Sequence, residues 1–274
     1  MRLRRLSSAL LIACLPLLAQ AMEEVPFVTS PDNVTLEMLR IAGVGKDDHV
    51  IDLGSGDGRI VILAAQRFGA SGLGVEIVPD LVRQSQESAR KAGVADRVEF
   101  REQDIFKTDL SKASVITMYL LPEVNLALRP ELLKLRPGTR IVSHDWDMGD
   151  WKPDQTTVLP VPDKKVGLEK TSKVHLWTVP ADVQGLWCGT GLVRGVQFAV
   201  EQSFQNFTAT MTRAGRVREY EGTVQGNRLH SLPGAKRAME LRVQGPHLEL
   251  VGGDSTFALL KGAQLARSAH GRCD

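Results

Sequence analysis

The sequence has 274 residues, of which 43% are hydrophobic and 24% are charged, and its formal net charge is +2. These values are close to the average for soluble globular proteins, and they exclude disordered, collagen-like and polytopic membrane classes. Residues 22–180 carry 20 basic and 24 acidic side chains, and residues 181–274 carry 11 and 8. Neither half therefore has the basic surplus expected of a protein that binds nucleic acid.

Residues 1–21 have the layout of a secretory signal peptide. Three arginines precede an apolar run from Leu6 to Ala19, and a small-x-small motif ends at Ala21. The apolar run is too short to span a bilayer comfortably, so we expect cleavage after Ala21 and export to the periplasm. The alternatives are an uncleaved segment that anchors the protein to a membrane and a lipoprotein-like box ending at Cys14.

Short apolar runs alternate with helical patterns between residues 31 and 180. This alternation predicts an α/β fold with a Rossmann-like, doubly wound sheet in a first domain that spans residues 22–180. The predicted strands cover residues 48–53, 72–76, 97–101, 113–119 and 138–143. The predicted helices cover residues 31–43, 58–68, 79–92 and 123–134. Two later runs, 156–161 and 174–179, are expected to pair as an antiparallel hairpin at the sheet edge.

The pattern changes at Pro180-Ala181-Asp182, after which strand-like alternation replaces the helical period. Glycine-containing turn signals recur from there to the C-terminus at the spacing of a small all-β fold. We therefore predict a second, smaller all-β domain over residues 181–274, a barrel or a sandwich of unknown role. After export, Cys188 and Cys273 would stand in a compartment where disulfides persist, either bridged or as two buried thiols.

The most specific motif lies between Val50 and Arg59, where an apolar strand passes through three alternate glycines into a helix. Glycines allow a tight turn and a close approach of ligand to backbone. Nicotinamide and flavin fingerprints space their glycines G-x-G-x-x-G, unlike this loop. The acid at the strand end would repel a pyrophosphate but attract the sulfonium and amino groups of S-adenosylmethionine; a glycine-rich turn without ligand is the alternative. The predicted cofactor contacts here are Asp52, Gly54, Ser55, Gly56, Asp57 and Gly58.

Further cofactor contacts are predicted after the second and third strands. Glu76 ends the second strand, placed to accept hydrogen bonds from both ribose hydroxyls, with Ile77 beside it. Asp104 and Ile105 follow the third strand, where a carboxylate can bind the adenine amino group and an apolar side chain can cover the ring. Solvated surface acids are the alternative for Glu76 and Asp104.

Candidate catalytic residues follow the fourth and fifth strands, at the carboxyl edge where open α/β folds bind ligands. Tyr119 is predicted to line the methyl-transfer pocket, with core packing as its alternative. His144 and Asp145 are predicted to orient the nucleophile or to take its proton, with purely structural roles at a strand end as their alternative. The other five histidines lack metal-ligand spacing, so no metal site is predicted.

Over residues 27–180 the sequence resembles the class I, seven-strand, S-adenosylmethionine-dependent methyltransferases. More narrowly, it is similar to the group that contains the ATP synthase c-subunit lysine methyltransferase and the archaeal protein-lysine methyltransferases. Phe27 stands where those relatives have a tyrosine, and the domain after Pro180 is an addition that they lack. The matching segments are Phe27–Pro31, Asp52–Ile60, Leu120–Pro122 and Pro137–His144.

The resemblance implies an N-methyltransferase that uses S-adenosylmethionine and acts on a protein lysine. The Asn-Pro-Pro-Tyr type element that many amide and nucleobase methyltransferases carry after the fourth strand is absent, which disfavours DNA as a substrate. Because the cofactor is made in the cytoplasm, export also leaves two alternatives open. One is an exported, non-catalytic binding or scaffold protein with this fold, and the other is a methyltransferase for small molecules.

Overall fold

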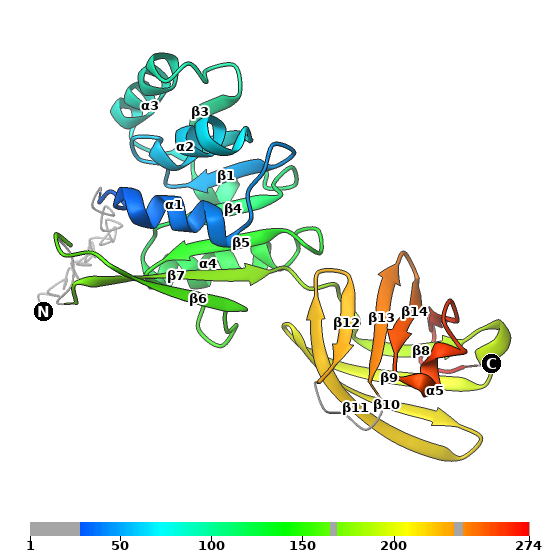
Figure 1. Ribbon diagram of the computed structural model, residues 1–274. Helices are drawn as coiled ribbons and strands as arrows, with labels where there is room; N and C mark the ends of the chain where they lie inside the picture. Colours follow the sequence, from blue (N-terminus) through cyan, green and yellow to red (C-terminus); the bar gives the residue numbers. More distant parts are fainter. Residues whose placement is uncertain (1–27, 165–168, 233–237, 274) are drawn as a thin grey trace, which may run out of the picture.

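The computed structural model describes residues 28–164, 169–232 and 238–273, which form two domains (Figure 1). The first contains a seven-stranded mixed sheet with helices, and the second is a closed barrel of eight strands. The predicted signal peptide at residues 1–21 and the segment start at Phe27 lie outside the described residues. No helix in the described ranges is long and apolar enough to cross a membrane.

The first domain has the predicted doubly wound architecture. Its strand order is β3-β2-β1-β4-β5-β7-β6, with β1 to β5 parallel and the β6–β7 hairpin antiparallel at the edge. The strands are β1 (His49–Leu53), β2 (Ser71–Glu76), β3 (Val98–Glu102), β4 (Val115–Met118), β5 (Arg140–His144), β6 (Gln155–Pro160) and β7 (Thr171–Thr178). The helices are α1 (Asp32–Ile41), α2 (Arg59–Phe68), α3 (Pro79–Lys91), the short η1 (Ile105–Lys107) and α4 (Pro122–Leu132).

Both faces of the centre of this sheet are covered, which explains why β1, β4 and β5 are buried at nearly every position, whereas the edge strands β3 and β6 are partly exposed. Successive strand residues point to opposite faces, so neighbours in the sequence enter different cores. One core packs strand residues against α1 and α2, and it includes Val34, Met38, Leu39, Val50, Ile60, Ala64, Val115 and Val142. The other packs them against α4, and it includes Ile51, Leu53, Ile116, Met118, Leu128, Leu132 and Ile141.

The second domain is a barrel, which decides between the two predicted all-β architectures. Its hydrogen-bonded order is β10-β11-β12-β13-β14-β15-β8-β9, and every neighbouring pair is antiparallel. The strands are β8 (Gly185–Gly189), β9 (Val196–Ser203), β10 (Asn206–Arg213), β11 (Arg216–Gln225), β12 (Arg228–Ser231), β13 (Met239–Gln244), β14 (His247–Gly253) and β15 (Gln264–Arg267). Two single turns that the strand pattern did not predict are η2 (Gly191–Val193) and α5 (Ser255–Ala258).

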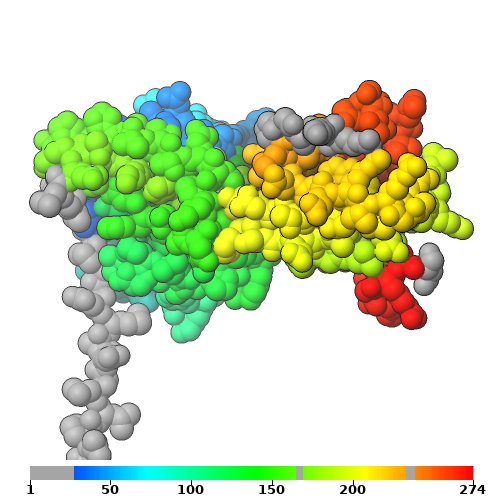
Figure 2. Space-filling model, turned by 90° about the horizontal axis from the view of Figure 1, so that it is seen from below, coloured from blue at the N-terminus to red at the C-terminus, as the bar shows by residue number. Residues whose placement is uncertain are grey.

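The two domains contact each other through the turn between β9 and β10. Phe204 in that turn stacks on Trp151 of the first domain, with ring centroids 6.1 Å apart, and the Arg129 guanidinium lies 5.5 Å from the centre of the same phenyl ring. The Gln205 side-chain amide donates a hydrogen bond to the Lys152 carbonyl. Figure 2 accordingly shows the barrel, in yellow, against the later, green part of the first domain.

Cys188 and Cys273 form a disulfide, with Cα atoms 5.5 Å apart. The sequence left open whether these cysteines form a disulfide or remain two buried thiols, and the structure has the disulfide. It ties the C-terminal segment to the first strand of the barrel, 85 residues earlier in the chain. A cross-link over a loop of this length removes conformational entropy from the unfolded chain, and such bonds typically stabilise a protein by about 2–4 kcal/mol.

Candidate active site

The glycine-rich loop joins the end of β1 to the start of α2 at the carboxyl edge of the sheet. Gly54, Gly56 and Gly58 have φ angles of +74°, +53° and +80°, a region that residues with a Cβ atom rarely adopt. A Cβ atom on Gly58 would also lie 2.7 Å from the ring of Phe100. The alternate glycines are therefore required by the path of the backbone and by packing under the loop.

Asp52 is buried at the end of β1, with 2% of its surface exposed. Its carboxylate accepts a hydrogen bond of 2.7 Å from the Thr117 hydroxyl on β4. Burial raises the pKa of Asp52 to about 7, and the neighbouring charges that act on it, Glu76 and Asp57, are both negative and raise it further. A buried acid in such surroundings favours a cationic ligand, because a positive charge stabilises its ionised form.

Glu76 organises the loop from the end of β2. One carboxylate oxygen accepts the Gly56 N–H at 2.9 Å, and the other accepts those of Ile77 and Val78 at 2.8 and 3.0 Å. A carboxylate offers about four acceptor positions, so three are already used by the backbone. The predicted contact with both ribose hydroxyls therefore requires them to share acceptor positions with a backbone N–H, and it stays a prediction.

Asp57 makes an ion pair within the loop. The Arg59 guanidinium binds it through two nitrogens, Nε at 2.9 Å and Nη2 at 2.6 Å, and its third nitrogen donates to the Ser30 carbonyl. The Arg59 position, where a dinucleotide fingerprint has a glycine, therefore links the loop to the segment before α1. The predicted role of Asp57 in cofactor contact must operate alongside this pair. Ser55 is buried, and its hydroxyl lacks a hydrogen-bond partner among the described residues.

Apolar side chains flank the outer part of this edge. Ile77 is 64% exposed and Phe106 is 51% exposed, although both are large and hydrophobic. Asp104 accepts a hydrogen bond from the Phe106 backbone N–H and lies 3.4 Å from the Lys107 ammonium group, and Ile105 is partly buried. Exposed apolar groups at a ligand-binding edge suit the face of an aromatic ring such as adenine. Ile77 was predicted from the sequence, whereas Phe106 was missed; its only signal is its position directly after Asp104-Ile105.

Tyr119 and His144, the residues predicted for the acceptor side, lie against each other. Their rings are stacked, with centroids 3.9 Å apart. The two ring nitrogens of His144 share hydrogen bonds with the hydroxyls of Ser30, at 2.8 Å, and Ser172, at 3.0 Å. Burial lowers the pKa of His144 to about 4, and it raises the pKa of the half-buried Tyr119. At neutral pH both side chains are uncharged, and the His144 ring packs against one face of the Tyr119 ring.

Asp145 closes the far end of this cluster. It has a φ of +64°, a strained conformation that aspartate tolerates better than most residues. One carboxylate oxygen accepts the Lys173 N–H at 3.0 Å, and the other lies 2.8 Å from the Lys164 ammonium group and 3.4 Å from His144 Nε2. Lys164 and Asp145 are 14% and 13% exposed at their side chains. The Asp145 carboxylate is therefore mostly occupied by a largely buried ion pair with Lys164.

Two further residues that sequence reasoning missed shape the loop after β5. Asn125 is fully buried at the start of α4, and its amide nitrogen lies 3.2 Å from both the Ser143 hydroxyl and the Trp146 carbonyl. Trp146 itself is 41% exposed. The apolar ring thus lies next in sequence to Asp145, on a loop that Asn125 holds in place. An asparagine within a helical pattern is too common for its function to be read from sequence.

The residues at the carboxyl edge of the sheet fit S-adenosylmethionine. Asp52 and Glu76 are buried acceptors at the ends of neighbouring strands, and the Ser55 hydroxyl is buried beside them without a partner in the described part of the chain. The acidic pair suits a ligand with cationic sulfonium and amino groups, and the exposed rim of Ile77 and Phe106 suits its adenine. Asp52, the loop from Gly54 to Gly58, and Glu76 would hold that group.

Comparison with known proteins identifies the same class. A family described as the ANTKMT methyltransferase domain matches residues 52–155. A protein-lysine N-methyltransferase of Saccharolobus islandicus is 44% identical over 133 residues, which are 48% of this chain and 83% of that protein. The ATP synthase c-subunit lysine N-methyltransferase of Mus musculus is 33% identical over 145 residues, 52% of this chain and 58% of that protein.

A solved structure bears on the cofactor. An RNA methyltransferase from Salinibacter ruber, in complex with S-adenosyl-L-homocysteine, is 51% identical, with a TM-score of 0.51, and the match covers 57% of this chain and 96% of that one. S-adenosyl-L-homocysteine is the product that S-adenosylmethionine leaves after methyl transfer, so S-adenosylmethionine is the cofactor. The chain belongs to the protein-lysine N-methyltransferase family of class I, S-adenosylmethionine-dependent methyltransferases.

Proposed function

We propose that this enzyme transfers a methyl group to the side-chain amine of a protein lysine. The observation that carries the proposal is the 44% identity to a protein-lysine N-methyltransferase over 83% of that protein's length. The chain spans 58% of the mouse c-subunit methyltransferase, so the particular protein substrate is not carried over. The site supports the proposal because its acceptor side is uncharged at Tyr119 and His144 and can receive a neutral amine.

A lysine acceptor must first lose a proton. With an ordinary pKa near 10.4, an amine is neutral at pH 7 in only about one molecule in 2,500, which corresponds to about 4–5 kcal/mol. Desolvation lowers the pKa of an amine, and alignment with the reacting carbon is worth up to about 7–11 kcal/mol in favourable cases. The enzyme therefore needs positioning and water exclusion more than a strong base.

S-adenosylmethionine supplies an electrophilic methyl group on a cationic sulfur. The lysine ammonium would first give its proton to water, and the neutral amine nitrogen would then form the new C–N bond as the C–S bond breaks, leaving S-adenosyl-L-homocysteine and a methylated ammonium. Tyr119, whose ring is fixed on His144, is proposed to line the amine's path, with its hydroxyl as a hydrogen-bond partner. His144 positions that ring, and Asp145 holds the strand end through Lys164. Trp146 is proposed to contact the aliphatic stem of the lysine, since its ring is 41% exposed.

RNA is the second candidate substrate, because the similar Salinibacter ruber protein is described as an RNA methyltransferase. Proteins that bind nucleic acid neutralise phosphates with lysine and arginine. Residues 22–180 of this chain instead carry 20 basic and 24 acidic side chains, a net charge of −4. A domain with an acidic balance is better suited to a basic peptide segment around a target lysine.

We further propose that the chain is exported through the segment at residues 1–21. The bond between Cys188 and Cys273 supports this assignment, because disulfides persist in oxidising compartments and are rare in the cytosol. The test is to express the full chain, separate periplasm from cytoplasm, and sequence the N-terminus of the product. A chain beginning at Met22 in the periplasm supports export, whereas a full-length chain in the cytoplasm would refute it.

The substrate is tested with methyl-labelled S-adenosylmethionine and an extract of the cell envelope. One portion of the labelled extract is treated with ribonuclease and another with proteinase K before the macromolecules are precipitated. The proposal predicts that only the protease releases the label. Release by ribonuclease would establish the RNA candidate, and label on small molecules alone would refute both. The Glu76→Ala variant, deprived of a predicted cofactor contact, serves as the control and should label more slowly at a limiting cofactor concentration.

A further inference from the structure

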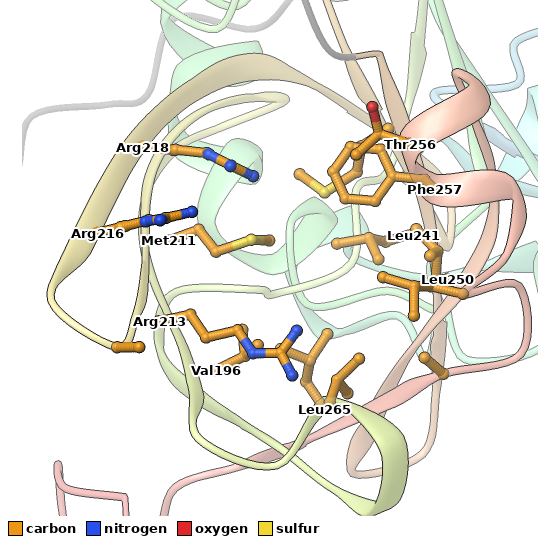
Figure 3. A pocket seen from close by; sticks show the side chains of 15 residues that line it. Val196, Met211, Arg213, Arg216, Arg218, Leu241, Leu250, Thr256, Phe257 and Leu265 are labelled. Atoms are coloured by element: carbon orange, nitrogen blue, oxygen red, sulfur yellow. The ribbon is translucent and has the colours of Figure 1, made fainter.

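The barrel encloses a cavity that the methyltransferase site does not use. Its volume is about 520 Å³, within the range of about 300–1,000 Å³ that is usual for pockets that bind small molecules. It opens at the barrel end formed by the β10–β11 hairpin. Figure 3 shows three arginines on one wall, Arg213, Arg216 and Arg218, with Leu241, Leu250 and Phe257 on the opposite wall.

The arginines point inward because of strand register. Inward-facing positions alternate along β10 and β11, where Phe207, Ala209 and Tyr220 are buried in the barrel core. The same alternation puts Arg213, Arg216 and Arg218 on the inner face, nearer the open end. Arg213 is the cross-strand partner of Arg216, and Met211 is the partner of Arg218. Three arginines, all of them exposed residues near the open end, therefore lie on one wall of a largely apolar cavity.

These three arginines have no internal counterion among the described residues. Like charges that face each other across a strand pair are destabilising, so such a group is normally balanced by carboxylates. The barrel's ion pairs in the described ranges involve other arginines: Arg228 with Glu240, Arg242 with Glu249, and Arg267 with Asp182. The three cavity arginines are thus available to an anion that enters from outside.

Apart from Thr256, the remainder of the cavity lining is apolar. Met211, Leu241, Leu250 and Phe257 line it, and they belong to or pack against the barrel's hydrophobic core. Two exposed apolar side chains are the sequence neighbours of lining residues: Leu192, next to Val193, is 83% exposed, and Leu259, next to Leu260, is 91% exposed. A ligand that buried only a charge would leave this apolar wall in contact with water. The complementary ligand has both an anionic group and a hydrocarbon body.

We propose that the barrel binds a small amphipathic anion, with its carboxylate or phosphate at Arg213, Arg216 and Arg218 and its hydrocarbon body against Leu241, Leu250 and Phe257. The ligand enters as a free molecule and occupies a site separate from the cofactor loop. Arginine is suited to the anionic group, because its planar fork can donate two parallel hydrogen bonds to one carboxylate or phosphate.

The test is calorimetric titration of the full chain with decanoate, 1-decanol and decyltrimethylammonium. The proposal predicts one decanoate bound per chain with a Kd below about 100 µM, at least tenfold weaker binding of the neutral alcohol, and no binding of the cation. Saturating S-adenosyl-L-homocysteine is expected to leave the decanoate affinity unchanged. Equal affinity for decanoate and decanol would overturn the arginine assignment, and displacement by S-adenosyl-L-homocysteine would overturn the separate site.

Variants locate the site within the barrel. Replacing Arg213, Arg216 and Arg218 together by glutamine is expected to weaken decanoate binding at least tenfold while leaving decanol unchanged. Arg194→Gln, an exposed barrel arginine outside the cavity, is the matched control and should bind as the parent does. Leu250→Trp, which fills the apolar part, is expected to weaken both ligands. Circular dichroism confirms that each variant folds, and folded variants with parental affinity would refute the proposal.

Free amphiphiles and membrane lipids share this chemistry, so a vesicle experiment distinguishes the two sources. The exported form of the chain, which begins at Met22 and lacks the basic, apolar segment 1–21, is mixed with phosphatidylglycerol vesicles and, separately, with phosphatidylcholine vesicles, and sedimented. The proposal predicts that the chain stays in the supernatant in both cases while it binds decanoate in solution. Sedimentation with phosphatidylglycerol vesicles, with no binding of free decanoate, would overturn the proposal in favour of a membrane-surface site.

Discussion

The ring of Tyr119 lies on the ring of His144, with centroids 3.9 Å apart and planes inclined by 30°. His144 is 1% exposed and hydrogen-bonded at both nitrogens, so the pair behaves as one rigid unit at the ends of β4 and β5. The structure therefore distinguishes the environments of two residues that the sequence could only place at the ends of neighbouring strands. Tyr119 is only partly buried whereas His144 is fully buried behind it, which is why Tyr119 is the one of the two proposed to contact a substrate.

The buried state of His144 predicts a pH dependence of stability. The pKa of His144 is lowered to about 4 by burial, against 6.5 for an exposed histidine. Between these values the unfolded chain binds the proton and the folded chain does not. The contribution of neutral His144 to the free energy of unfolding is therefore complete above pH 6.5 and is lost as the pH falls towards 4. Between pH 7 and pH 5 the free energy of unfolding should fall by about 2 kcal/mol. Chemical denaturation at both pH values measures it.

The control for this effect is His144→Gln, which keeps a side-chain amide for hydrogen bonding but cannot titrate. We expect the free energy of unfolding of this variant to change less between pH 7 and pH 5 than that of the parent. An identical pH dependence in the two proteins would show that His144 is not held in its neutral form by the fold.

Asp52 should make cofactor affinity depend on pH. Its pKa is raised to about 7, so the fraction of ionised carboxyl falls about tenfold per pH unit below that value. The dissociation constant for S-adenosylmethionine is expected to rise accordingly between pH 8 and pH 6. Asp52→Asn retains an oxygen for the Thr117 hydroxyl but removes the charge, so it should bind weakly at both pH values. Calorimetric titration gives the constants.

The same substitution should stabilise the protein without cofactor. The carboxyl of Asp52 ionises near 3.8 when unfolded and near 7 when folded, so folding stability falls as the pH rises through that interval. Asp52→Asn should therefore raise the melting temperature at pH 8, while Asp47→Asn, at an exposed position, should leave it unchanged. A lower melting temperature for Asp52→Asn would contradict the assignment of a buried, unpaired charge.

Glu76 is predicted to contribute to cofactor binding both directly and through the loop. Glu76→Ala removes an acceptor for the ribose and the partner of the Gly56 N–H. Hydrogen bonds that involve a charged group contribute about 1.5–3 kcal/mol, so affinity should fall about ten- to hundredfold. Gly56→Val should have a comparable effect, because Gly56 has a φ of +53°. Glu87→Ala, on the exposed face of α3, is the control; parental affinity in both site variants would remove them from the site.

The contact between Phe204 and Trp151 predicts how the domains depend on each other. We expect residues 22–180 alone to fold and to bind S-adenosylmethionine as the full chain does, because the glycine-rich loop is held by first-domain residues such as Glu76 and Phe100. The fragment should be less stable, since Trp151 loses the covering ring. Phe204→Ala in the full chain should lower the stability of the first domain by about 1.5–3 kcal/mol. A fragment without native circular dichroism would show that the barrel completes the first core.

The first domain was largely predictable because its central strands are short apolar runs that alternate with helical patterns. A run such as Val50–Leu53 can be buried on both faces only as a central strand of a sheet that is covered on both sides. The barrel was predictable as an all-β domain but not as a closed barrel, because alternation fixes which face is buried and not how the sheet closes. The alternation along the strands places Arg213, Arg216 and Arg218 on the same face of the sheet. Charged residues in a strand usually point outward, so the sequence did not indicate that these three line a cavity.

The candidate site was predictable where backbone conformation demands a particular residue, as at the glycines after Asp52. It was less predictable where partners come from distant parts of the chain. Ser30 and Ser172 lie 114 and 28 residues from His144, and together they occupy its ring nitrogens. No local pattern indicates that a strand-end histidine will be enclosed in this way. Lys164, which neutralises Asp145, follows a hairpin strand and carries no motif.

The most direct test of lysine methylation is to remove the lysine amines from the acceptor. A cell-envelope extract is divided, and the lysines of one half are blocked by acetylation, which converts each amine into a non-nucleophilic amide, before incubation with the full chain and methyl-labelled S-adenosylmethionine. Tyr119→Phe, which keeps the stacked ring but loses the hydroxyl, should label the untreated half about two- to tenfold more slowly. The account predicts methyl-lysine as the labelled product after acid hydrolysis of the untreated half, and background label in the blocked half. Equal labelling of both halves would contradict it.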